Sequence, residues 1–287
     1  MLTGKSIHHV NQGPGTCYSK DKVAGYYNDL TEKVLRDDPE LLVPQYSVDT
    51  GETIYFSIGI FQYGLASYDL YLKTGEQRYL EKTLACADWA VENQQDNGGW
   101  VTFAFKDPEH PYSSMAQGEG LSLLIRAYLV TKERKYFDSA VRCKDFMLLP
   151  ISDGGTTCYE GNDVSFYEYT GGALILNGWI FSLWGLYDYC KFNPEDVVSS
   201  KVLNATLCTL EKKLSEFDTG FWSKYDNRKR ICSPFYHKLH IAQLNVMYNL
   251  FGTETFSRYA VKWEKDQRSL WKTKLAFVIK AWQKILE

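Results

Sequence analysis

The chain has none of the long apolar segments that mark membrane-spanning or secreted proteins. Its most apolar stretch, residues 173–187, is shorter than the roughly 18 residues of a membrane span and contains Asn177. The opening residues, MLTGKSIHHVNQGPG, hold no apolar core of a signal peptide. We therefore expect a cytoplasmic chain without a membrane segment; a luminal protein that lacks its anchor is the alternative.

Cysteine pairs and several well-known catalytic signatures are also missing. The seven cysteines are scattered without a C-x-x-C pair, which favours reduced thiols over a disulfide framework or a zinc site. No glycine-rich phosphate loop, G-x-S-x-G turn or Cys–His signature occurs. The chain thus gives no sign of P-loop, serine-hydrolase or cysteine-protease chemistry.

A basic, aromatic segment is present instead at residues 219–244, TGFWSKYDNRKRICSPFYHKLHIAQL. It holds five cationic side chains and one carboxylate, Asp226, in a protein whose net charge is −3. Trp222, Tyr225 and Tyr236 lie among these cations. A mildly acidic protein that gathers cations and aromatic rings in one segment is expected to bind an anionic partner there. The alternative is a solvated basic loop.

Four apolar segments recur at a period near 60 residues. Each ends near a tyrosine, and Tyr68, Tyr128, Tyr187 and Tyr248 are separated by 60, 59 and 61 residues. A short polar turn and a more amphipathic helix follow each segment. The pattern predicts an all-α fold, an (α/α) barrel or toroid of about four helical hairpins with buried inner helices and half-exposed outer ones. A three-layer helical solenoid is the alternative.

The connections between hairpins predict where a site would be built. Turns within a hairpin fall at one end of the ring, and the long connections from each outer helix to the next inner helix fall at the other. These are residues 96–116, 150–175 and 218–238. Long loops gathered on one face of a rigid scaffold are where binding sites are commonly formed.

Two regions are expected along the chain. Residues 1–50 would form an N-terminal extension that lines the cleft, and residues 51–287 would form the barrel. Within the extension, residues 25–30 with Pro44 and Tyr46 suggest a β-hairpin.

Polar residues near the starts of the inner helices are candidates for chemistry. Glu168, flanked by aromatic residues, could have its pKa raised by desolvation and act as a base. The alternative is an exposed carboxylate favoured by a helix dipole. Gln117 and Glu119 could bind a ligand or cap a helix. His237 and His240 could share a helix face, but no acidic or cysteine ligand accompanies them, so we predict no metal site.

Several stretches together match one family of proteins. They are YFSIGIFQYGL (55–65), ENQQDNGGW (92–100), SSMAQGEGLSLLIRAYL (113–129), EYTGGALILNGWIFSLWGLYDY (168–189), DTGFWSKYDNR (218–228) and YHKLHIAQL (236–244). Over roughly residues 50–265 the chain resembles the D-glucuronyl C5-epimerases, which convert glucuronic to iduronic acid in heparosan and heparan-type chains. The resemblance implies an (α/α) barrel and assigns Glu168 with Tyr169, Tyr225 with Arg228, and Tyr236 to the active site.

The chain departs from this family in two respects. The animal enzymes carry a sizeable β-rich domain before the helical part, whereas about 50 residues precede it here. Where the family has Glu-Tyr-Pro, this chain has Glu168-Tyr169-Thr170. The shorter front is expected to affect chain-length preference, oligomer contacts and any calcium site that belongs to the missing domain.

The chemistry that the resemblance implies is inversion at C5 of a uronate. Arg228 with Tyr225 would neutralise the uronate carboxylate, and Glu168 and Tyr236 would exchange protons on opposite faces of the sugar. Nearby cations would depress the pKa of Tyr236. Proton exchange needs no redox cofactor. A uronate polysaccharide lyase on the same scaffold and a non-catalytic uronan-binding module are the alternatives.

The expected partner is an anionic, heparosan-like polysaccharide, and no nucleic-acid partner is expected. The apolar stripe of the C-terminal WKTKLAFVIKAWQKILE would suit a homodimer interface or packing onto the same domain. The residues assigned to substrate binding are Trp222, Lys224, His237, His240, Gln117, Glu119 and Asn177.

Overall fold

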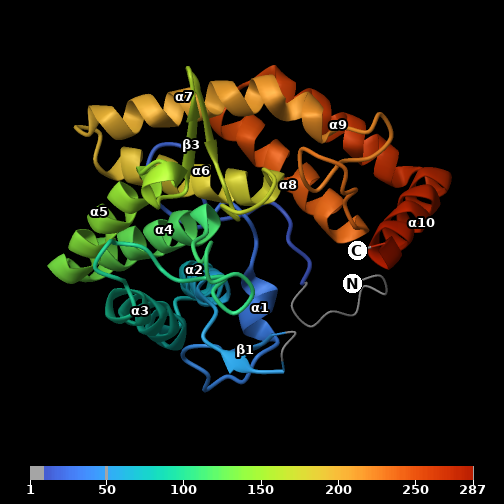
Figure 1. Cartoon of the computed structure of the whole chain (residues 1–287). Coiled ribbons are helices and arrows are strands. Elements are labelled where there is room, and N and C mark those ends of the chain that lie inside the picture. Colours follow the sequence, from blue (N-terminus) through green and yellow to red (C-terminus); the bar gives the residue numbers. More distant parts are fainter. Residues whose placement is uncertain (1–9, 49–50, 287) are drawn as a thin grey trace.

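The computed structural model describes residues 10–48 and 51–286, which fold around four buried helices. These inner helices are α2 (Ser57–Thr74), α4 (Ser114–Thr131), α6 (Leu176–Phe192) and α8 (Pro234–Phe251). Neighbouring inner helices pack in the order α2, α4, α6, α8, since each is apolar around most of its circumference. The outer helices are α3 (Gln77–Glu92), α5 (Arg134–Leu148), α7 (Val197–Lys213) and α9 (Glu254–Arg268) (Figure 1). The predicted all-α (α/α) barrel of four hairpins is confirmed, and the solenoid alternative is wrong.

Three of the hairpin turns are closed by a residue in the left-handed region. Gly75, Lys132 and Gly252 follow α2, α4 and α8 with φ of 73°, 62° and 70°. Each donates its backbone N–H to the carbonyl four residues earlier, which satisfies one of the last carbonyls of the helix. The long connections lie at the opposite end of the barrel, as predicted, and comprise residues 93–113, 149–175 and 218–233.

Strands are confined to two short antiparallel hairpins in the described part of the chain. They are β1 (Tyr46–Ser47) with β2 (Thr53–Ile54), and β3 (Thr157–Glu160) with β4 (Asp163–Phe166). The N-terminal hairpin exists but not where it was expected, because residues 25–30 contribute only an isolated bridge between Asn28 and Pro14. The β1–β2 pair instead crosses the predicted boundary at residue 50. The β3–β4 hairpin, which the sequence did not predict, projects past α7 (Figure 1).

The N-terminal segment joins the two ends of the row of inner helices, since α2 and α8 are not packed closely against each other. It hydrogen-bonds in turn to α8 through Asn11, to α6 through Ser19, to α4 through Ala24 and to α2 through Tyr26. The short helix α1 (Thr31–Leu35) follows and packs on α2. This segment therefore completes the wall of the barrel.

A buried ion pair anchors the N-terminal segment. Arg126 of α4 and Asp188 of α6 are fully buried and meet at 2.6 Å. The guanidinium also donates to the carbonyls of Ala24 and Gly25, at 2.8 and 3.0 Å. The Asp188 carboxylate accepts a hydrogen bond from the hydroxyl of Tyr27 at 2.6 Å. Because both charges have several hydrogen-bond partners, the network fixes this stretch, and with it α1, against the barrel.

The last helix, α10 (Leu270–Leu286), lies at the edge of the molecule beside α8 and α9 (Figure 1). Gln283 attaches it to the 218–233 connection by accepting the backbone N–H of Ile231 at 3.0 Å. Its outer face keeps large apolar side chains such as Trp271, which is 62% exposed. Packing onto the same domain thus covers one side of the predicted stripe, and dimerisation stays a prediction. Across the described residues, no helix has the length and apolar character needed to cross a membrane.

Candidate active site

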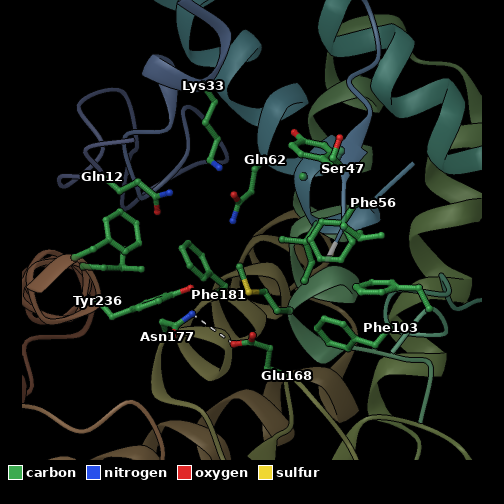
Figure 2. Close-up of a pocket in the computed structure, with 18 residues that line it drawn as sticks. Gln12, Lys33, Ser47, Phe56, Gln62, Phe103, Glu168, Asn177, Phe181 and Tyr236 are labelled. Carbon is green, nitrogen blue, oxygen red and sulfur yellow. Dashed lines mark hydrogen bonds between the residues drawn. The ribbon is translucent and has the colours of Figure 1, made fainter. Parts of the chain in front are cut away.

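Two cavities open at the end of the barrel where the inner helices begin. The smaller, here called the inner cavity, has a volume of about 280 Å³, and the larger, the basic cavity, about 870 Å³. Glu168 and Phe103 lie on the walls of both. Other residues of the inner cavity are Gln12, Lys33, Gln62, Asn177, Phe181 and Tyr236 (Figure 2). Other residues of the basic cavity are Lys106, Tyr169, Tyr225, Arg228, Lys229 and Arg230.

The first turns of all four inner helices reach the inner cavity. The cavity wall includes Gly59 of α2, Met115 of α4, Asn177 of α6 and Tyr236 of α8. A helix N-terminus carries a partial positive charge, so four such ends around one space favour an anion within it. The long-loop end of the barrel, predicted to carry the site, is therefore where a suitable cavity lies.

Glu168 is positioned by the β3–β4 hairpin, two residues after β4 ends. The carbonyl of Tyr167 accepts the backbone N–H of Ser114 at 3.0 Å, which holds this stretch against α4. The carboxylate lies against the start of α6, where Asn177 donates to its Oε2 at 3.4 Å (Figure 2). Gly178 provides the space, because a Cβ there would lie 2.2 Å from that oxygen.

Burial sets the acidity of this carboxyl group. Glu168 is only 9% exposed, and burial raises its pKa to about 7, although the positive charges of Arg230 and Lys106 oppose the shift. The residue lies outside any helix, so the alternative of an exposed carboxylate at a helix start is wrong. A carboxyl with a pKa near neutrality can both accept and return a proton under physiological conditions.

Tyr225 and Tyr236 meet edge to face, with ring centroids 4.8 Å apart. Tyr236 lines the inner cavity and Tyr225 lines the basic cavity. Burial raises the pKa of both phenols, and the negative charge of Glu168 raises each further. The expectation that cations would depress the Tyr236 pKa is wrong, because burial dominates and Arg228, Lys229 and Arg230 line the other cavity. Both phenols therefore keep their protons at neutral pH.

Three of the four cations of the 218–233 connection line the basic cavity, namely Arg228, Lys229 and Arg230. Arg230 pairs with the buried carboxylate of Asp226 at 2.5 Å and lies over the ring of Tyr225, 5.2 Å from its centroid. Arg228 is exposed to solvent. The structure thus brings Arg228 and Tyr225 to one cavity, as the sequence suggested, but it does not bring Arg228 to the inner cavity.

Tyr169 belongs to a small cluster beside the basic cavity. Its hydroxyl and Nδ1 of His110, the latter at 3.0 Å, both contact Oδ2 of Asp107. The hydrogen bond to Asp107 raises the pKa of Tyr169. Since the hydroxyl already has this partner, Tyr169 offers mainly its ring to the cavity wall. Nothing in the spacing of the 93–113 connection singled out Asp107 or His110.

Three residues assigned to substrate binding form a buried cluster beneath the 218–233 connection. Trp222 stacks on His237 with ring centroids 3.6 Å apart, and both are fully buried. Nδ1 of His237 accepts the backbone N–H of Ser223 at 3.1 Å. Burial lowers the pKa of His237 and of His240 to about 3, so both imidazoles are neutral. None of the three lines either cavity; their contacts attach the loop to α8.

Other assigned residues also lie away from the cavity walls. Gln117 and Glu119 are fully buried within α4, and Lys224 is half-buried outside both cavities. Glu119 is connected to the inner cavity through Gln62, whose Nε2 donates to its Oε1 at 2.8 Å. Among the assigned substrate-binding residues, Asn177 lines the inner cavity. In the described ranges, no group of three or more His, Cys, Asp or Glu residues is arranged to hold a metal ion.

The polar residues of the inner cavity that were not anticipated are Gln12, Lys33, Ser47 and Gln62. Gln62 has a recognisable signal, since it is a polar residue in the first turns of an otherwise apolar inner helix, as Asn177 is. Lys33 and Gln12 come from the N-terminal segment, where no periodic pattern indicates which side chains face the barrel.

The arrangement of hairpins defines the fold class of the protein as an (α/α) barrel. A cellobiose 2-epimerase from Spirochaeta thermophila superimposes with a TM-score of 0.52 and 12% identity over 73% of this chain and 57% of that one. A GH76 α-mannanase from Bacteroides thetaiotaomicron gives a TM-score of 0.51 and 16% identity over 76% of this chain and 63% of that one. At such identities the likeness shows the fold alone.

The sequence places the chain more narrowly. Residues 94–265 match the family model described as D-glucuronyl C5-epimerase C-terminus, and the chain belongs to this family. It is 30% identical over 207 residues to a D-glucuronyl C5-epimerase of Caenorhabditis elegans, which covers 62% of this chain and 34% of the relative. It is 26% identical over 159 residues to an uncharacterized protein of Methanocaldococcus jannaschii, which covers 53% of this chain and 51% of the relative. The chain thus spans between a third and about half of the length of these relatives.

Proposed function

We propose that this chain inverts C5 of D-glucuronate residues in a heparosan-like polysaccharide, giving L-iduronate by proton abstraction and re-protonation. The observation that carries the proposal is that Glu168, with a pKa raised to about 7, and Tyr236, which keeps its proton, line one cavity from different elements. Family membership supports the reaction. Aromatic rings on the inner cavity and cations on the basic cavity suit the sugar faces and carboxylates of a uronate polymer.

The proton steps follow from the states of these two groups. Glu168, whose pKa is raised to about 7, is partly ionised at neutral pH and takes the C5 proton. The electron pair of the broken C5–H bond delocalises into the adjacent carboxylate as an enolate. Tyr236 delivers its proton to the opposite face of C5, and exchange with solvent returns both groups to their starting states. No bond to C4 breaks and nothing is oxidised or reduced.

The neighbouring residues would have distinct tasks. Asn177 would orient the Glu168 carboxylate through its hydrogen bond, and Tyr225 would support the ring of Tyr236 through their edge-to-face contact. Arg228 and the other cations of the basic cavity would hold uronates next to the reacting residue, because they line a space adjacent to the inner cavity.

Incubation with heparosan in D₂O, followed by NMR at the uronate C5 position, tests the proposal. We expect deuterium at C5 and iduronate signals without loss of chain length, and loss of both in Glu168→Gln and Tyr236→Phe. Tyr248→Phe, at the far end of α8, is a matched control that should keep the activity. Unsaturated, ultraviolet-absorbing ends would indicate a lyase instead, and binding without any exchange would indicate a uronan-binding module.

A further inference from the structure

The inner cavity holds a positive side chain that lies outside the basic segment. Lys33 of α1 lines this cavity, and among the residues that the structure describes no other lysine or arginine does. Figure 2 shows the Lys33 ammonium entering from the N-terminal side near Gln62, while Glu168 and Asn177 lie on the opposite wall. The cavity thus has a cation facing its candidate base across the space that a ligand would fill.

We propose that Lys33 binds the carboxylate of the uronate residue that reacts, an inference that rests on the proposed function. For proton transfer on both faces, C5 must lie between Glu168 and Tyr236, which places the reacting sugar in the inner cavity. Its carboxylate is attached to C5 and gains charge when the enolate forms, so a cation is needed within the same cavity. Arg228 and its neighbours line only the basic cavity and are placed for other uronates.

The surroundings of Lys33 leave its charge available for a ligand. Within residues 10–48 and 51–286 its ammonium group forms no ion pair and no hydrogen bond. Its backbone N–H donates to the carbonyl of Leu30 within the first turn of the helix. Burial lowers its pKa, while the negative charges of Glu119 and Asp37 act in the opposite direction without direct contact. A partly desolvated cation without a bonded partner gains more from an incoming carboxylate than a solvated surface lysine does.

Its position is also fixed rather than left to a free segment. The Arg126–Asp188 pair holds residues 24–27 through three hydrogen bonds, the backbone N–H of Tyr26 donates to Asp69, and α1 begins a few residues later. A binding residue held by a rigid support loses little freedom when its ligand arrives. The N-terminal segment therefore forms part of the cavity wall and also connects the four inner helices.

Exchange and binding measurements on a set of variants test the role of Lys33. Lys33→Gln should lower kcat/KM for C5 exchange roughly 10- to 100-fold, mostly through kcat, because the charge on the carboxylate grows in the transition state. Lys33→Arg should retain more activity than Lys33→Gln. Arg36→Gln is the matched control. It removes a solvent-exposed cation at the end of the same helix, where Arg36 pairs with Glu32. Its kcat/KM should stay within about twofold of the wild type.

A double variant separates ligand binding from a purely structural role. If Lys33 only neutralised the buried Glu119, Lys33→Gln combined with Glu119→Gln would regain the activity lost in Lys33→Gln. We expect no such rescue, and rescue would overturn the proposal. The proposal would also be overturned if kcat and KM of Lys33→Gln both stayed within twofold of the wild type, the limit set for the control.

A binding measurement keeps this inference separate from the proposed reaction. The wild type should bind a heparosan oligosaccharide more tightly than its carboxyl-reduced form, and Lys33→Gln should lose much of that preference. If the wild type shows no C5 exchange, the proposed reaction fails, yet the carboxylate preference can still be measured. If exchange occurs and the preference is unchanged in Lys33→Gln, the reaction stands and the role of Lys33 is refuted.

Discussion

Replacing Glu168 by glutamine removes an ionisable group from a buried position, and stability and activity should respond in opposite directions. Folding raises the pKa of this carboxyl from 4.5 to about 7, so the folded state prefers its protonated form. At about 1.4 kcal/mol per pKa unit, ionised Glu168 costs the folded state about 3 kcal/mol. The cost is absent below a pH of about 4.5, grows as the pH rises to about 7, and is constant above it. Glutamine does not ionise, so the variant avoids the cost.

Urea unfolding of the wild type and Glu168→Gln at about pH 5 and about pH 8.5 measures this effect. From about pH 5 to about pH 8.5, we expect the wild type to lose about 2–3 kcal/mol in free energy of unfolding relative to the variant. C5 exchange should be lost at both. Glu195→Gln, an exposed carboxylate in the turn between α6 and α7, is the control and should show no such growth. A difference that does not change with pH would refute the assignment of Glu168 as a desolvated base.

Three further changes test the site and its support. C5 exchange by the wild type should increase as the pH rises through about 7, because only ionised Glu168 accepts a proton; a flat NMR rate profile would contradict this. Gly178→Ala brings a Cβ to 2.2 Å from a Glu168 carboxylate oxygen and should lower exchange roughly 100-fold, with Gly13→Ala, which enters open space, as its control. Arg126→Met leaves Asp188 buried without its charged partner and should lower the free energy of unfolding in urea by about 3–5 kcal/mol; a loss below about 1 kcal/mol would refute the anchoring role.

The barrel could be predicted from the sequence because its signal is local and repeated. Each inner helix is a run of mostly apolar residues that ends near a tyrosine, and the near-constant spacing from Tyr68 to Tyr248 shows that the unit recurs. The placement of long connections on one end then follows from the alternation of inner and outer helices. The β3–β4 hairpin carried no such repeat, and neither its existence nor its effect on Glu168 could be foreseen.

The site could be predicted only in part. Asn177 and Tyr236 reach the inner cavity because each begins an inner helix at the end where the helices converge. Trp222, His237 and His240 belong to the same aromatic and basic segment as Tyr236. The composition of a segment does not reveal which of its side chains face the barrel. These three are buried, whereas Arg228, Lys229 and Arg230 of the same segment line the basic cavity.

Charge counting along the chain also misjudged the acidity of Tyr236. The cations near it in sequence suggested a depressed pKa, but the field at a phenol depends on distance and burial in space. In the structure, burial and the negative charge of Glu168, which lines the same cavity, both raise the pKa of Tyr236. Lys33 is the opposite case, a cation that lines the same cavity as Glu168 although it is far from Glu168 in sequence.

The anchor formed by Arg126 and Asp188 implies an order in which the molecule can be assembled. Tyr27 and its partner Asp188 are 161 residues apart in the chain, so this anchor cannot be completed during synthesis until α6 has emerged. The first hairpins can pair as they appear, and α1 can pack on α2, whereas the ion pair of Arg126 with Asp188 forms only later. A nascent chain would therefore hold its N-terminal segment firmly across the barrel only after the third inner helix is in place.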